Sequence, residues 1–226
     1  MIVLLLLAAQ EEMKLPPFYQ KRVDYRGLPI ASSAKVPDAA LKAARDTVER
    51  MTSKRPEIVP ELVRRGVRVA IMAETELTTD IPEHADLKPK EKWDKRARGL
   101  GATASRPAVS GAEENLLKYP KDPYKGEDIF LHEFAHTIHV MAMERLEPGF
   151  DAELKRLYAA AMAKGLWAKT YAAENAGEYF AEGVQSWFDA NRQADPPDGI
   201  HNHVNTRAEL KAYDPDLAAF LEKLFP

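Results

Sequence analysis

The sequence predicts an α+β fold, with a small mixed sheet and helices in the N-terminal part and a helical C-terminal part. Two observations support this fold class. Short stretches with strand-like alternation occur early in the chain, whereas apolar residues at helical spacing dominate after residue 126. Strands that come first and helices that follow favour α+β over alternating β-α-β units. A length of 226 residues suits one domain with a sizeable core.

The first 72 residues are expected to form two short strands and two helices. Residues 10–37 are interrupted by prolines and predict an extended arm with a short strand near 27–30. Apolar residues at helical spacing predict helices at about 37–53 and 58–65. Residues 67–72 then alternate in the period-2 pattern of a strand that is covered on at least one face.

Regular patterns are lost between residues 78 and 107, where prolines and glycines predict a long loop region that contains His84 as an exposed residue. Its basic segment, residues 88–98, is interpreted as a solvated loop, and the alternative is a site for an acidic partner. Five helices are expected in the remainder of the chain, at about 127–144, 150–164, 175–191, 207–213 and 215–224.

Composition excludes several classes of function. The net charge of −3 argues against a dedicated nucleic-acid binder. The absence of cysteine excludes a disulfide framework, a thiolate zinc site and a cysteine nucleophile. Any metal must therefore be bound by His, Asp or Glu. No integral membrane span is predicted, because no apolar run is long enough.

The first nine residues form a signal-like segment. Met1 is followed by eight apolar residues, too few to cross a bilayer but typical of the apolar region of a secretory signal. A basic start and a small residue before the cleavage site are missing, so a buried first strand is the alternative. We expect a secreted, periplasmic or extracellular protein whose domain spans residues 10–226.

An HExxH motif occupies residues 132–136. The spacing of four places the His132 and His136 rings one turn apart on one helix face, where their nitrogens can converge on one Zn²⁺. Glu133 lies about 100° around the helix, where it can reach a water on the metal without being a ligand. A catalytic zinc needs a third protein ligand. His139 cannot supply it, because about 10 Å of helical rise separates it from His132, and we expect it to hydrogen-bond in a pocket wall.

The segment 171–182 is the better source of a third ligand. Tyr171, Asn175, Glu178 and Glu182 are spaced by four, three and four residues, which predicts one polar stripe on a helix whose other face is apolar. An alternative interpretation is a capping box of Asn175 and Glu178, with Glu182 as a solvated charge.

The two segments together resemble the gluzincin metallopeptidases related to anthrax lethal factor and the Pro-Pro endopeptidases. The resemblance is carried by HEFAH at 132–136, Tyr171 and NAGEYFAE at 175–182. It implies a zincin-like single catalytic domain with one Zn²⁺ per chain. The implied ligands are His132, His136 and Glu178, with Glu133 as the general base and Tyr171 as the oxyanion donor. Glu182, with Asn175, would orient the ligand imidazoles.

The predicted function is that of a zinc-dependent endopeptidase acting on a peptide or protein substrate, which could pair with the strand near 67–73 or with part of 103–111. One alternative is a non-catalytic zinc-containing extracellular binding domain, and another is a glycan-binding protein that uses the basic loop. His201 and His203 are expected in a surface loop, because two prolines and a glycine precede them, although H-x-H can bind metal on a strand. His203 is kept as a pocket candidate. The sequence does not predict the oligomeric state.

Overall fold

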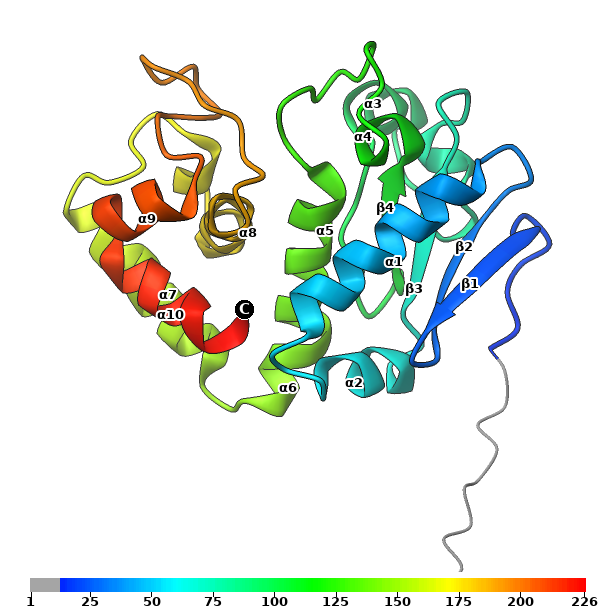
Figure 1. The fold of residues 1–226 in the computed structure, drawn as a ribbon, viewed down its shortest axis with the longest axis horizontal. Helices are drawn as coiled ribbons and strands as arrows, with labels where there is room; N and C mark the ends of the chain where they lie inside the picture. The colour runs from blue at the N-terminus through cyan, green and yellow to red at the C-terminus, as the bar shows by residue number, and fades with distance from the viewer. Residues whose placement is uncertain (1–12) are drawn as a thin grey trace, which may run out of the picture.

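The computed structural model describes residues 13–226, and Figure 1 shows their arrangement. The expected signal-like segment 1–9 lies outside the described residues. Within the described part of the chain, every helix is too short or too polar to cross a membrane.

Four short strands form one mixed sheet in the order β1-β2-β3-β4. β1 (Lys21–Tyr25) and β2 (Leu28–Ser32) form an antiparallel hairpin, and Gly27 at its turn has a φ of +86° that favours glycine. β3 (Arg68–Met72) is parallel to β2, and β4 (Ala108–Ala112) is parallel to β3. The predicted α+β class with a small mixed sheet is therefore confirmed.

Both faces of β3 are buried. Helices α1 (Asp38–Thr52) and α2 (Ile58–Arg64) connect β2 to β3 and contribute to the main hydrophobic core together with Val69 and Ile71. Ala70 and Met72 belong to a second, smaller apolar cluster. Since β3 pairs with a strand on each side, the expectation that residues 67–73 offer a free edge is wrong.

The segment 78–107 is more ordered than the sequence predicts. It contains two short 3₁₀ turns, Thr78–Asp80 and Pro82–His84, and the helix α3 (Lys90–Arg96), so the basic segment is largely helical. His84 was expected to be exposed, but it is buried, with its Nε2 atom 3.1 Å from the Ser110 hydroxyl. The hydroxyl of Ser110 on β4 supplies the polar partner that makes this burial tolerable.

The expected helix at 127–144 begins as α5 (Ile129–Ile138), whose N-terminus is capped by the Asp128 carboxylate. After Ile138 the chain widens into a π-helical turn, His139–Met143, before α6 (Glu144–Leu146). The apolar residues Phe130, Phe134, Ile138 and Met141, which are spaced as one helical stripe, are buried. The short helix α4 (Glu113–Leu116) lies between β4 and α5 in the chain.

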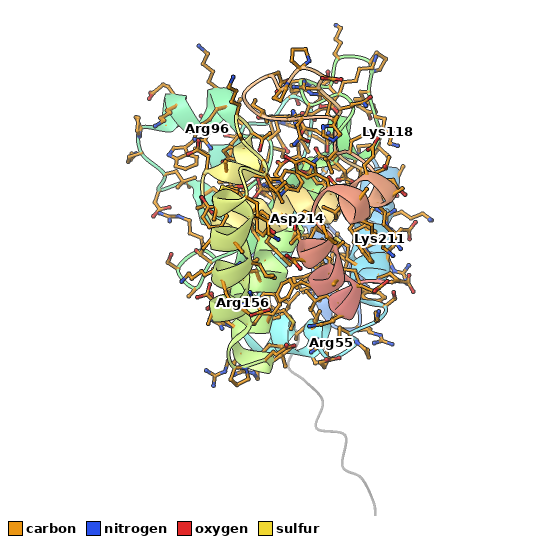
Figure 2. All side chains as sticks on the ribbon, turned by 90° about the vertical axis from the view of Figure 1, so that its left-hand side faces the viewer. Arg55, Arg96, Lys118, Arg156, Lys211 and Asp214 are labelled. Atoms are coloured by element: carbon orange, nitrogen blue, oxygen red, sulfur yellow. The ribbon has the colours of Figure 1, made fainter. Side chains whose placement is uncertain are left out.

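The C-terminal helices pack around α8 (Ala176–Trp187), which is buried along most of its length and lies against α5. Figure 1 shows α5 between the sheet and these helices. Asp214, labelled in Figure 2, accepts hydrogen bonds from the Trp167 indole and the Tyr179 hydroxyl and so ties α8 to its neighbours. The remaining elements are α7 (Phe150–Ala163), a 3₁₀ turn (Tyr171–Ala173), α9 (Arg207–Tyr213) and α10 (Pro215–Leu224).

Candidate metal centre and active site

Two neighbouring helices bring three ligand atoms together. His132 and His136 lie one turn apart on α5, and Glu178 lies in the first turn of α8. The Nε2 atoms of the two histidines are 3.1 Å apart, and each lies 3.1 Å from Glu178 Oε2. The three atoms therefore form a nearly equilateral triangle, although Glu178 is more than forty positions from either histidine in the sequence.

Asn175 explains how α8 presents this carboxylate. Its side-chain oxygen accepts a hydrogen bond of 3.0 Å from the Glu178 backbone N–H, as expected for an N-cap residue. The Glu178 side chain does not complete a capping box, because its carboxylate faces the two imidazoles. Asn175 thus fixes the first turn of α8 and makes no hydrogen bond to either ring among the described residues.

The donor set fits a zinc ion. Two imidazole nitrogens and one carboxylate oxygen are the ligands of catalytic zinc sites that keep a fourth position open. Zinc bonds of about 2.0–2.1 Å at tetrahedral angles separate neighbouring ligand atoms by about 3.3 Å, close to the 3.1 Å observed. The spacing and chemistry of these atoms are therefore compatible with one shared Zn²⁺.

The other nitrogen of His132 is held by Gln185. Its Nδ1 lies 2.9 Å from Gln185 Oε1, while the Gln185 amide donates to the Asp128 carbonyl at 3.1 Å. A glutamine oxygen can only accept, so His132 Nδ1 carries a proton, and Nε2 is the ring nitrogen that faces Glu178 and His136. Glu182 lies farther away, at 3.5 Å, and accepts a hydrogen bond of 3.0 Å from Asn191.

The ionisable groups around the two imidazole rings shift the pKa values of one another. Burial acts to lower the pKa of His132, but the hydrogen bond to Glu178 and the neighbouring carboxylates raise it to about 10. Burial also acts to raise the pKa of Glu178, and the two imidazoles outweigh it and hold that pKa well below the usual range. For Glu182, burial raises the pKa. The shifts of His132 and Glu178 therefore have one main cause, the mutual attraction between the imidazole of His132 and the Glu178 carboxylate.

Tyr171 is placed beside this triangle by the turn that precedes α8. Its backbone N–H donates to the Ile200 carbonyl at 2.8 Å, and its hydroxyl lies 3.3 Å from Glu178 Oε1. Burial and the Glu178 carboxylate raise the pKa of Tyr171 to about 12, so the hydroxyl remains a proton donor at neutral pH.

The triangle lies in the wall of a cavity of about 720 Å³, which Glu133 and Tyr171 also line. The Glu133 carboxylate has no hydrogen bond or ion pair within the described part of the chain. Its neighbour His132, by contrast, is engaged at both nitrogens. Glu133 is therefore the carboxylate that is available to accept a proton inside this cavity.

Two glycines allow another wall of the cavity to approach α5 closely. A Cβ at Gly99 would lie 3.0 Å from Glu133 Cγ, and one at Gly101 would lie 2.9 Å from His136 Cβ. Between them, Leu100 forms an antiparallel bridge with Ser110 of β4. This segment, for which the sequence predicts a loop, places backbone groups beside the candidate site.

The structure does not bring His139 or His203 to the cavity. His139 is buried between the rings of Phe150 and Phe180, with Nε2 3.4 Å from Asp151. His139 begins the π-helical turn after α5, and the rise of about 10 Å over seven residues separates it from His132 along the helix axis. His203 is exposed, and its ring contacts Tyr213.

His201 lies in the irregular segment that the sequence predicts, but its ring is buried. Its Nε2 atom lies 3.0 Å from the carboxylate of Glu127, which lines the cavity. Glu127, which precedes α5, therefore gives the His201 ring a polar partner. This contact makes the burial of a histidine in an irregular segment possible.

Comparisons with known proteins show a likeness of fold. No family model matches the chain, and no curated protein matches its sequence. One solved structure with a similar fold is that of the Pro-Pro endopeptidase PPEP-2 from Paenibacillus alvei, with a TM-score of 0.57 and 18% sequence identity over 85% of this chain and 95% of that chain. At this identity the likeness shows a shared fold.

Proposed function

We propose that this chain is a zinc-dependent endopeptidase. The observation that carries the proposal is the triangle of His132, His136 and Glu178, which stands in a cavity wall beside an unpaired carboxylate and a tyrosine hydroxyl. The fold shared with a solved endopeptidase supports it. Zinc bound at this triangle would supply Lewis acidity, which lowers the pKa of water to about 7 and polarises a carbonyl.

Glu133 is assigned the proton transfers. It follows His132 directly on α5, so its carboxylate enters the same cavity without belonging to the triangle. From that position it can accept a proton from the attacking water and then deliver the proton to the leaving amine. Both transfers use one side chain, because the attacking water, which gives up the proton, and the leaving amine, which receives it, occupy the same region of the cavity in successive steps.

Tyr171 is assigned to the oxyanion. Its hydroxyl keeps its proton, lines the cavity and lies next to Glu178, so it can donate to the oxygen of a carbonyl under attack. Such a donor stabilises the charge that develops in the transition state more than it stabilises the ground state.

Replacing Tyr171 by Phe is expected to lower kcat by about 10²–10³ with little change in KM, because the ring is kept and only a transition-state interaction is lost. Steady-state kinetics on a cleaved peptide measure the effect, and Tyr158→Phe is the matched control. The Tyr158 hydroxyl donates to the Ala173 carbonyl and does not line the cavity. Equal kcat values for the parent and Tyr171→Phe would contradict the assignment.

Cleavage of a peptide library by the purified chain tests the proposed function. We expect cleavage at internal bonds, its loss after treatment with a chelator, and its recovery when zinc is added back, because two imidazoles and a carboxylate hold zinc reversibly. A chain that holds one zinc but cleaves no peptide would contradict the enzyme and favour the non-catalytic zinc-containing binding domain. Cleavage that persists without metal would contradict the zinc mechanism.

A further inference from the structure

Three arginines line the cavity, and two of them are already neutralised by the protein. Arg98 donates to the Glu114 carboxylate at 2.6 and 3.0 Å, and Arg192 donates to Asp198 at 2.8 Å. Within residues 13–226, Arg96 makes no ion pair with any carboxylate. The cavity therefore presents one cation whose charge is not balanced by a neighbouring acid.

Arg96, labelled in Figure 2, is held in place although its side chain is exposed. It is the last residue of α3, and its backbone carbonyl accepts a hydrogen bond from the Tyr124 hydroxyl. Its guanidinium carbon lies 5.3 Å from the centre of the Trp93 ring, and the Trp93 indole N–H donates to the Lys88 carbonyl at 3.3 Å. A guanidinium stacked on a ring keeps its N–H edges free for a planar acceptor.

This guanidinium is close enough to act on the groups at the candidate site. Arg96, Trp93 and Tyr171 line the same cavity. Burial and Glu178 raise the pKa of Tyr171, and the charge of Arg96 acts in the opposite direction, so it lies within electrostatic range of that hydroxyl. A substrate that contacts Tyr171 therefore also experiences the field of Arg96.

The remaining charges in the cavity would orient an anionic substrate. Glu133 lines the cavity from α5, and Glu127 lines it just before α5. Neither carboxylate belongs to the triangle of His132, His136 and Glu178, so both would repel a substrate carboxylate, whereas the Arg96 side of the cavity attracts it. Opposite charges at different places in one cavity favour a single orientation of the substrate.

We propose that Arg96 binds a carboxylate of the peptide substrate and makes the protein selective for acidic peptides. The inference rests on the proposed peptidase function. An Asp or Glu side chain and a free C-terminus present the same planar acceptor, to which a guanidinium can donate two parallel hydrogen bonds. Trp93 contributes by holding the guanidinium plane.

A paired peptide library tests this proposal. Each peptide is made with Glu, Gln or Lys at every position in turn, and with a C-terminal acid or amide, so that the two sources of the carboxylate are distinguished. We expect the parent to cleave one acidic member of such a pair about tenfold faster in kcat/KM, as a charge-assisted hydrogen bond predicts. Arg96→Gln should remove this preference, and Arg96→Glu should shift it toward Lys at the same position.

Lys95→Gln is the matched control, because Lys95 is an exposed cation on the same helix that does not line the cavity. It should keep the preference of the parent. A reversal of preference in Arg96→Glu is a result that loss of folding cannot produce. Zinc content and circular dichroism of each variant show that the centre and the fold are intact.

Retention of the same library on immobilised, zinc-treated Glu133→Gln protein separates the two proposals. If the parent cleaves peptides but the acidic and neutral members of every pair are cleaved equally, this inference is overturned and the proposed function stands. If no peptide is cleaved, the proposed function is overturned, and the inference is then decided by retention. Enrichment of acidic peptides that disappears with Arg96→Gln supports it, and equal retention overturns it.

Discussion

Replacement of Glu133 by Gln is expected to lower the rate of peptide cleavage by several orders of magnitude while one zinc per chain is retained. The amide keeps the size of the side chain but cannot accept a proton at neutral pH. A positioned acid or base contributes about 10²–10⁴ to a rate, and Glu133 is assigned two transfers. The metal is unaffected, because Glu133 is not part of the ligand triangle.

Single-turnover cleavage and elemental analysis of the same sample measure both parts of this prediction. Glu144→Gln is the matched control, since Glu144 follows the same helical region but does not line the cavity. It should cleave at the rate of the parent. If Glu133→Gln cleaved as fast as Glu144→Gln, Glu133 would not be the residue that transfers the proton.

Replacement of Glu178 by Ala is expected to abolish tight zinc binding and, with it, all cleavage. Two imidazoles alone do not hold a catalytic zinc, because such sites use three protein ligands. The loss also leaves the His132 and His136 nitrogens without their shared acceptor. This variant differs from Glu133→Gln in a measurable way, since its inactivity comes from the missing metal.

Zinc titration followed by calorimetry distinguishes the two variants. Glu174→Ala is the control for Glu178→Ala, because Glu174 is an exposed acid four residues earlier that does not line the cavity. We expect Glu174→Ala to bind one zinc like the parent. Unchanged zinc affinity in Glu178→Ala would show that the third ligand lies elsewhere.

Helical periodicity predicted most helices of this fold, but the sheet was predicted less well. The α1 and α2 segments were found because each has one apolar face along its whole length. β4 has the sequence Ala-Val-Ser-Gly-Ala, in which small residues hide the strand pattern. They are needed because Phe130 of α5 packs directly on Gly111, where a Cβ would lie 3.0 Å from the Phe130 Cβ.

The order within segment 78–107 could not be predicted because it depends on distant residues. His84 is buried against Ser110, and Thr79 is bound to Asp94 of α3. Prolines and charges suggested a loop, and only tertiary contacts reveal the short helix. The π-helical turn after α5 also leaves no mark on the apolar spacing of the sequence.

The candidate site could be predicted to the extent that it follows helix spacing. His132, Glu133 and His136 lie within one turn, and Glu178 lies on the polar stripe of α8, so the sequence indicated which side chains share a face. Gln185 lies three residues beyond Glu182 on the same stripe and could have been added by extending that pattern.

No pattern of helix spacing in the sequence indicated that Arg96 belongs to the candidate site. The basic segment 88–98 suggested solvated charge, and nothing in its spacing connects Arg96 with Tyr171, seventy-five positions later in the chain. The connection requires the fold, in which α3 and the turn before α8 contribute to one cavity.

A crystal structure of the zinc-soaked protein, with diffraction data collected on both sides of the zinc absorption edge, tests the central claim most directly. We predict a single anomalous peak within about 2.0–2.1 Å of the Nε2 atoms of His132 and His136 and of a Glu178 carboxylate oxygen. A peak at other residues, or none at these three in crystals of a protein that still cleaves peptides, would contradict the account.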